Sequence, residues 1–353
     1  MPVSVDRRLV LTGLLTLPVT ARAQGFAGLG TGARGYAMPR PGPFDFPADH
    51  GPHPEFRIEW WYVTANLRDA AGRDCGVQWT LFRSALAPPG AGPEGPWAAQ
   101  QAWMGHAAVT TPEVHLSAER LARGGTGQAG ASVQPFGAWI DDWRLTGPTP
   151  DRVEMVARGD AFSYALTLAA DGPVVPQGEG GYSVKSAAGQ ASRYYSQPFY
   201  RAEGQLRLGD AAVQQVSGTA WLDREWSSQP LAEDQSGWDW FSLNFDSGEK
   251  LMAFRLRGEG APFVSATWIA ADGTPTPYGG TALRIAPLRE AAVAGRQVPV
   301  AWSLALPEKG VDIRVEAVND AAWMTTAVAY WEGPMRISGS HGGRGYLEMT
   351  GYD

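Results

Sequence analysis

The feature that most constrains the fold is a strand pattern that occurs twice in the chain. Residues 57–67 form a run rich in β-forming residues, and residues 237–245 repeat it at one constant offset. The matching pairs are Trp60 with Trp238, Tyr62 with Trp240, Thr64 with Ser242, and Asn66 with Asn244. Each run turns through glycine into a second strand that ends in an arginine, Arg83 or Arg257. This repeat predicts two equivalent domains, each opening with the same hairpin and closing as its own antiparallel β-barrel.

The composition favours the same architecture. A chain of 353 residues suits two domains, because single hydrophobic cores stop growing well below this size. Glycine (44 residues), proline (27) and tryptophan (15) are abundant, and frequent turns with many aromatic residues are typical of all-β proteins. No segment predicts a helix of the length that an α/β enzyme needs. We therefore expect an all-β fold, with one barrel over residues 44–226 and the other over residues 227–353.

The first 23 residues predict an export signal. Arg7 and Arg8 precede an apolar run that extends to Val19, and residues 21–23 read Ala-Arg-Ala, as at a signal-peptide cleavage site. Paired arginines indicate the twin-arginine route, although ordinary secretory leaders also carry two basic residues. Residues 24–43 predict a flexible lead-in, and no later stretch is apolar enough to span a membrane. We expect a periplasmic or secreted protein.

Charge and motifs exclude several classes of function. A net charge of −7 with only 18% charged residues leaves no basic surface for nucleic acid. Cys75 is the only cysteine, so no intramolecular disulfide can form. The sequence contains no nucleophile elbow, P-loop, dinucleotide fingerprint or zinc motif, and its five histidines are scattered. Among these, His50 and His53 lie in a proline-rich loop and are interpreted as packing residues. We expect neither a cofactor nor a metal.

A second unusual strand, residues 218–226, carries two acids. Alternation places Trp221, Asp223 and Glu225 on one face and Leu222, Arg224 and Trp226 on the other. Two neighbouring carboxylates cannot both stay ionised in an apolar cavity without a cation, so one of them should titrate high or pair with an arginine. A salt-bridge network at the rim of a barrel explains the same pattern without any ligand.

Glu59 is the acid of the first repeated strand, and it needs a fixed cation or water because glutamate is seldom buried alone. Its counterpart in the second repeat is Gly237, so Glu59 belongs to the first barrel alone. That asymmetry makes it a stronger candidate for a specific role than the repeated tryptophans, which are more simply interpreted as barrel core.

Several segments, in order, resemble the AttH/CrtC-like family of bacterial predicted secreted hydrolases. The resemblance covers residues 44–353. It is carried by residues 46–54, Glu59-Trp60-Trp61-Tyr62, Gly105-His106-Ala107-Ala108, Trp221-Leu222-Asp223-Arg224-Glu225-Trp226, Gly237-Trp238-Asp239-Trp240-Phe241, Tyr330-Trp331-Glu332-Gly333 and Gly345-Tyr346-Leu347-Glu348. The family includes carotenoid 1,2-hydratases and an accessory component of ABC export systems. The resemblance implies two lipocalin-like barrels, a bound apolar ligand and a cavity bordered by the strands rich in tryptophan and acids.

Two functions follow as expectations. The first is an exported protein that binds a hydrophobic lipid or isoprenoid-like molecule for a pathway linked to an ABC transporter. The alternative is a cofactor-independent hydratase (a hydro-lyase), cyclase or hydrolase, in which a buried acid protonates a double bond. The carotenoid hydratases carry a histidine where this chain has Arg224, which argues against transferring their activity. Fold analogy alone does not supply a reaction.

The candidate residues are the same under both hypotheses. The candidate catalytic acids are Glu59, Asp223, Glu225 and Asp239. The candidate ligand-binding residues are Trp61, Tyr62, His106, Tyr195, Trp221, Arg224, Trp226, Trp238, Trp240 and Tyr330. A purely structural interpretation, in which these residues close two small barrels, stays open for each of them.

Overall fold

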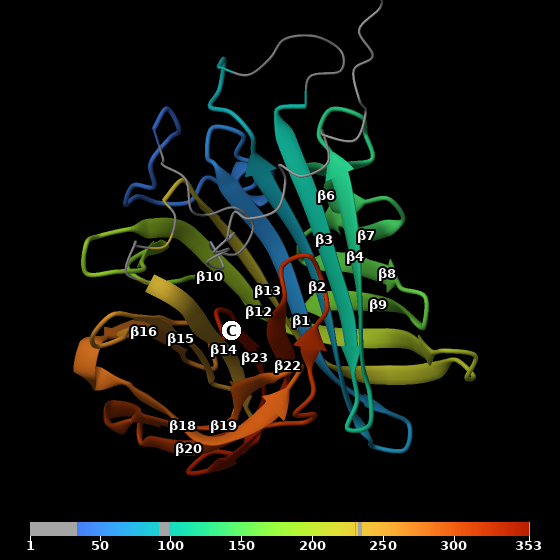
Figure 1. The fold of residues 1–353 in the computed structure, drawn as a ribbon, viewed down its shortest axis with the longest axis vertical. Coiled ribbons are helices and arrows are strands. Elements are labelled where there is room, and N and C mark those ends of the chain that lie inside the picture. Colours follow the sequence, from blue (N-terminus) through green and yellow to red (C-terminus); the bar gives the residue numbers. More distant parts are fainter. Residues whose placement is uncertain (1–33, 92–98, 230, 232–234, 353) are drawn as a thin grey trace, which may run out of the picture.

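The computed structural model describes residues 34–91, 99–229, 231 and 235–352. The predicted signal peptide and the first part of the predicted lead-in lie outside these ranges. The described residues form two strongly curved antiparallel β-sheets, one an almost closed barrel and the other a half-barrel (Figure 1), together with three short 3-10 helices at Ala48–His50, Gly280–Ala282 and Pro307–Lys309. None of the helices in these ranges is long and apolar enough to cross a membrane.

The first sheet closes almost completely and contains thirteen strands in this part of the chain. They are β1 (Ile58–Asp69), β2 (Asp74–Ala85), β3 (Gln101–Thr110), β4 (His115–Arg123), β5 (Ala129–Ser132), β6 (Phe136–Ile140), β7 (Trp143–Thr149), β8 (Arg152–Arg158), β9 (Phe162–Ala170), β10 (Val175–Pro176), β11 (Tyr182–Val184), β12 (Ala191–Leu208) and β13 (Gln214–Ser227). Their order is β4-β3-β2-β1-β13-β12-β9-β8-β7-β6-β5, and β10 and β11 pair with β12.

The second sheet forms a half-barrel of ten strands in the described residues. They are β14 (Gln235–Phe245), β15 (Lys250–Gly258), β16 (Phe263–Ile269), β17 (Pro275–Gly279), β18 (Arg284–Val293), β19 (Arg296–Leu306), β20 (Val311–Ala317), β21 (Trp323–Met324), β22 (Tyr330–Gly339) and β23 (Gly343–Met349). Their order is β17-β16-β15-β14-β23-β22-β20-β19-β18, and β21 pairs with β22.

The two sheets share one topology, as the sequence repeat predicts. β1 lies between its hairpin partner β2 and the last strand of its sheet, β13, whereas β14 lies between β15 and the last strand β23. Both sheets then run outward through consecutive hairpins on one side. The prediction of an all-β fold with two tandem barrels is confirmed. The chain changes sheets between β13 and β14, so the expected boundary after residue 226 falls at the end of β13.

Side chains fill the interior of both barrels. In β1, Trp61, Val63 and Ala65 point into the first core and are fully buried. In β14, Phe241 and Leu243 occupy the same place in the second core. Successive residues of a strand point to opposite faces, so their neighbours in sequence must face outward.

The outward faces of the two barrels pack against each other. Tyr62, Tyr194 and Trp221 of the first sheet form one buried cluster with Trp240 and Phe254 of the second. In Figure 1 the second sheet, orange and red, lies directly beneath β1 and β2 of the first. Burying aromatic residues of both sheets in one cluster couples the barrels into one packed unit.

Ion pairs at the edge of the contact hold the barrels in register. Arg336 and Arg344 of the second sheet both reach Asp74 at the start of β2, with nitrogen–oxygen distances of 2.8 Å. Asp74 is partly buried, and these cations keep its pKa below the ordinary value although burial opposes them.

Candidate ligand-binding site between the barrels

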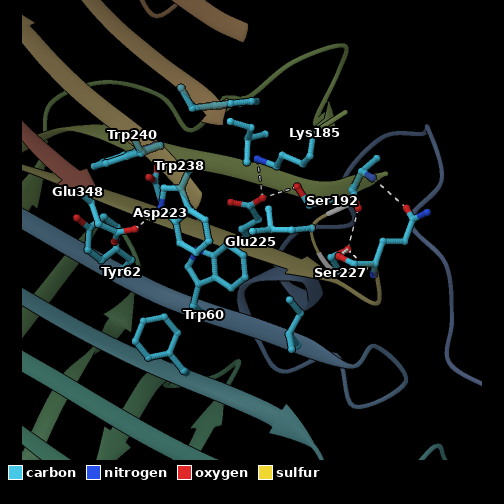
Figure 2. Close-up of a pocket in the computed structure, with 17 residues that line it drawn as sticks. Trp60, Tyr62, Lys185, Ser192, Asp223, Glu225, Ser227, Trp238, Trp240 and Glu348 are labelled. Carbon is cyan, nitrogen blue, oxygen red and sulfur yellow. Dashed lines mark hydrogen bonds and ion pairs between the residues drawn. The ribbon is translucent and has the colours of Figure 1, made fainter. Parts of the chain in front are cut away.

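A cavity lies at the contact between the two barrels (Figure 2). It has a volume of about 880 Å³, counting the part that opens to solvent. It is lined by Ile58, Trp60, Tyr62, Phe82, Lys185, Ala191, Ser192, Asp223, Glu225, Ser227, Gln229, Leu231, Trp238, Trp240, Phe254, Leu256 and Glu348. Most of these side chains come from β1, β2, β12 and β13 on one side and from β14, β15 and β23 on the other, whereas Lys185, Gln229 and Leu231 lie in the segments before β12 and after β13.

The repeated aromatic residues form the walls of this cavity. Trp60 and Tyr62 of β1 meet Trp238 and Trp240 of β14, and the rings of Tyr62 and Trp240 pack edge to face with centroids 5.2 Å apart. The interpretation of the repeated tryptophans as barrel core is therefore wrong. They lie on the outward face of each strand, whereas Trp61, on the opposite face of β1, fills the first core.

Asp223 of β13 is a buried acid without a cation partner among the described residues. It accepts hydrogen bonds from Trp221 Nε1 (2.7 Å), Tyr194 Oη (2.8 Å) and Ser196 Oγ (2.5 Å). Burial raises the pKa of Asp223 to about 7, because the loss of hydration outweighs these three hydrogen bonds. Near neutral pH this carboxyl group can therefore either donate or accept a proton.

Glu348 of β23 is a second acid of this kind. Trp238 Nε1 donates to its Oε1 atom at 2.6 Å. Burial raises the pKa of Glu348 to about 7, and the nearby charge of Asp223 acts in the same direction. Two acids of similar pKa thus face one apolar cavity.

Glu332 lies beside Glu348, opposite it in the register of β22 and β23. It is fully buried and accepts a hydrogen bond of 2.5 Å from Tyr62 Oη, whose ring lines the cavity. Burial, followed by the charge of Glu348, raises the pKa of Glu332 well above its ordinary value. Glu332 is thus a third acid behind the cavity wall.

Glu225 is neutralised by a lysine. Lys185 Nζ lies 2.8 Å from Glu225 Oε1, and Ser192 Oγ donates to the same carboxylate (Figure 2). The lysine also lies over the rings of Tyr194 (4.9 Å) and Phe254 (4.4 Å). The sequence led us to expect that one acid of this strand would titrate high or pair with an arginine; burial raises the pKa of Asp223, and Glu225 pairs with Lys185.

Glu59 lies outside this cavity, in an ion-pair cluster on the other face of β1. Its Oε2 atom is 2.5 Å from Arg224 Nη2, and Arg83 Nε contacts Oε1. These two arginines, with a hydrogen bond from His53, hold the pKa of Glu59 well below its ordinary range even though burial opposes them. Arg224 also lies 3.7 Å from the centre of the Trp61 ring. The surroundings of Glu59 are those of a structural ion pair.

Asp239 occupies similar surroundings in the second barrel. Arg255 Nε lies 2.7 Å and Arg257 Nε 3.4 Å from Asp239 Oδ2, and Tyr352 Oη donates to Oδ1 at 2.8 Å. Each barrel therefore buries one acid between two arginines. The inference that Glu59 has no counterpart is wrong, because the equivalent acid lies two positions further along the repeated strand.

The remaining predicted ligand-binding residues divide into three groups, none of which lines the cavity in the described structure. Trp221 packs at the contact between the barrels, where it holds Asp223. Trp226 stacks on His53, with ring centroids 3.8 Å apart, and Tyr195 Oη lies 2.7 Å from His50 Nδ1. His106 Nδ1 lies 3.0 Å from Tyr330 Oη.

Several lining residues were not predicted from the sequence, among them Trp60, Lys185, Ser192, Phe254 and Glu348. Trp60 carries a usable signal, because it matches the predicted residue Trp238 in the repeat. Glu348 stands out only as an acid close to an aromatic residue, and Lys185 has no signal, since its pairing with Glu225 depends on tertiary contacts. Within the described ranges, no group of three His, Cys, Asp or Glu side chains is arranged to hold a metal ion.

Comparisons with known proteins agree with this architecture. The model of the AttH-like family matches residues 37–352. NE1406 of Nitrosomonas europaea, a protein assigned to AttH, has a similar structure with a TM-score of 0.81 and 32% sequence identity, covering 90% of this chain and 99% of that one. A comparison with curated proteins finds no significant match.

Two further solved structures share the fold at lower identity. Kievitone hydratase from Nectria haematococca matches with a TM-score of 0.65 and 16% identity, over 88% of this chain and 94% of that one. CghA, solved with Sch210972, matches with a TM-score of 0.56 and 13% identity, over 91% and 97% of the two chains. With the family model spanning nearly all of the described residues, we conclude that the chain belongs to the AttH-like family.

Proposed function

We propose that the protein binds a hydrophobic small molecule, of the lipid or isoprenoid class, in the cavity between its barrels. The observation that carries this proposal is the cavity wall, in which six aromatic side chains and several aliphatic ones surround a few fixed polar groups. In the part of the chain that the structure describes, packed apolar side chains occupy the interior of both barrels. CghA, which was solved with the small molecule Sch210972, supports a ligand in this fold.

A titration with retinol, an isoprenoid polyene that quenches tryptophan emission, tests the proposal. We expect saturable quenching, because Trp60, Trp238 and Trp240 line the cavity. Leu256→Trp should fill the space and weaken binding at least tenfold. Leu288→Trp, the same substitution at an exposed leucine outside the cavity, is the matched control. Absence of saturable quenching, or equal affinity in both variants, would contradict the proposal.

A second candidate function is acid-catalysed hydration or cyclisation of such a molecule. It is favoured by Asp223 and Glu348, which hold protons at near-neutral pH inside an aromatic cavity. The acid transfers its proton to the less substituted carbon of a terminal isoprenoid double bond, which leaves a tertiary cation beside the indole rings. Water then adds to the cation and returns a proton to the carboxylate. Kievitone hydratase, a hydratase by name, has the same fold and supports this candidate.

Incubation with isoprenoid polyenes in isotopically labelled water tests the reaction. We expect a product that has gained one labelled water, with a rate lowered at least a hundredfold in Asp223→Asn, in line with the loss of a general acid. Glu225→Gln should lower the rate much less, because Glu225 is already paired with Lys185. Equal rates in the wild type and Asp223→Asn would exclude this acid.

We also propose that the protein works in the periplasm or is secreted, in a pathway linked to an ABC transporter. The support is the leader sequence with Arg7 and Arg8 and the family resemblance. Cell fractionation is the test. Replacing both arginines by lysine should keep the protein in the cytoplasm if the twin-arginine route carries it, whereas unchanged export would contradict that route.

A further inference from the structure

We propose that the cavity between the barrels selects organic cations, so that its ligand carries a positively charged amine or quaternary ammonium group on an apolar body. This inference rests on the proposed binding function and adds the charge of the ligand to it. Three observations support it: the cavity lining has more acids than cations, neutral hydrogen-bond donors hold two of these acids in place, and aromatic rings form the wall.

The cavity lining contains three acids and one cation. Asp223, Glu225 and Glu348 line it together with Lys185, and no arginine does so among the described residues. Lys185 is bound to Glu225 at 2.8 Å, so this pair adds no net charge. Asp223 and Glu348 are each more than nine-tenths buried and have no ion-pair partner in the described structure. A ligand with a positive charge would supply the missing partner.

Neutral donors hold both acids in fixed positions. The indole N–H groups of Trp221 and Trp238 each donate to one of the acids, and Tyr194 and Ser196 donate to Asp223. Such donors stabilise the ionised form without neutralising it. A cation that enters would therefore meet carboxylates that are already oriented and would not need to rearrange the wall.

The aromatic wall suits the same ligand. The polar edge of Trp238 is used by Glu348, and that of Trp240 by the hydroxyl of Tyr194 at 3.1 Å. The rest of these rings, with Trp60 and Phe254, borders the cavity. Aromatic rings beside acids are the chemistry with which proteins recognise ammonium groups, and the attraction grows when water is excluded.

Binding of a cation should be linked to proton release. The charged and titratable groups that face Asp223 and Glu348 are Glu225 with Lys185, Glu332, and the tyrosines Tyr62, Tyr194 and Tyr330. Burial raises the pKa of each of these tyrosines well above its ordinary value, so they stay neutral and do not compete for the cation. Below pH 7 the cation must displace a proton from Asp223 or Glu348, because both have a pKa of about 7. Its affinity should therefore rise with pH and level off above this value.

A matched pair of probes tests the inference on the full-length protein. Phenethyltrimethylammonium carries the charge, and (3,3-dimethylbutyl)benzene is its uncharged carbon isostere. We would titrate tryptophan fluorescence with each probe at pH 6 and at pH 8. The cation should bind about tenfold more tightly at pH 8, as expected for one acid with a pKa near 7, whereas the isostere should bind no more tightly at pH 8 than at pH 6.

Acid-to-amide variants identify the groups responsible. Glu348→Gln and Asp223→Asn should each weaken binding of the cation at pH 8 at least fivefold, while the affinity for the isostere should remain. Glu290→Gln, at an exposed glutamate, is the matched control and should change neither affinity. If the isostere binds as tightly as the cation at pH 8, the charge preference is overturned and the binding function stands. If neither these probes nor retinol binds, both are overturned.

Discussion

At the scale of single residues, four of the buried acids fall into two classes set by their partners. Glu59 and Asp239 each lie between two arginines, whereas Asp223 and Glu348 are held only by neutral donors. Burial penalises the charged form of Glu59, Asp223 and Glu348, and the two arginines reverse the direction of the pKa shift at Glu59. The first class stabilises the barrels, and the second gives the cavity its chemistry.

Removing the acid of the first class should destabilise the fold. Glu59→Gln leaves Arg83 and Arg224 buried without their counter-charge, and we expect the free energy of unfolding to fall by about 3–5 kcal/mol. Urea denaturation measures this loss. Glu316→Gln, which breaks an exposed pair with Arg314, should change little by comparison. Equal effects of the two substitutions would contradict a structural role for Glu59.

The acids of the second class, Asp223 and Glu348, should make the folded protein less stable as the pH rises. Their ordinary pKa values are 3.8 and 4.5, but both rise to about 7 in the folded protein. Between these values the folded chain holds more protons than the unfolded chain, so their contribution to the free energy of unfolding falls as the pH rises. In the wild type, each acid should lower the free energy of unfolding by on the order of 3 kcal/mol as the pH rises through this range. Asp223→Asn and Glu348→Gln should each abolish the corresponding loss.

Urea titrations of the wild type and of each variant at pH 4, 5, 6, 7 and 8 measure this difference. The variants should gain stability relative to the wild type mainly between pH 5 and 7. A difference that does not change with pH would show that the two acids titrate normally.

At the scale of the strand, the repeat explains both what the sequence reveals and what it conceals. The period of two in β1 and β14, with their matching residues, predicts the strands, the hairpins and the common topology. The pattern could not show which face is core, because Trp60 and Trp61 are both tryptophan. Only the packing of the second barrel against β1 makes Trp60 a cavity residue. Lys185 precedes β12 and reaches Glu225 of β13 through tertiary structure, which no local pattern records.

The close approach of β2 to the second barrel gives a test at this scale. A Cβ atom at Gly76 would lie 2.7 Å from Pro334 Cγ and 2.9 Å from Tyr346 Oη. Gly76→Ala should therefore lower the free energy of unfolding by about 1–3 kcal/mol through overpacking. Gly279→Ala is the control, because its Cβ atom would meet nothing closer than 3.8 Å. Chemical denaturation of both variants measures the effect, and equal stability would show that the strands are less closely packed here.

At the scale of the whole molecule, the two barrels behave as one body around a shared site. Each contributes one wall of the cavity, and the acids come from both, Asp223 from the first and Glu348 from the second. The buried cluster between the barrels and the pairs of Asp74 with Arg336 and Arg344 join them. The site therefore exists only in the assembled protein.

This coupling predicts a single unfolding transition. Separating the barrels would expose the aromatic cluster that contains Tyr62 and Trp240, so neither should unfold alone. Scanning calorimetry should show one peak, with the calorimetric enthalpy equal to the van't Hoff enthalpy. Two resolved transitions would indicate that the barrels are independent.

The central claim is that the ligand lies between the barrels and not inside one of them. A crystal structure of the protein grown with retinol tests it most directly. We expect density for the polyene in the cavity, in contact with Trp60 and Trp238 and beside Asp223. Density within the core of either barrel, or bound elsewhere with the cavity empty, would contradict it.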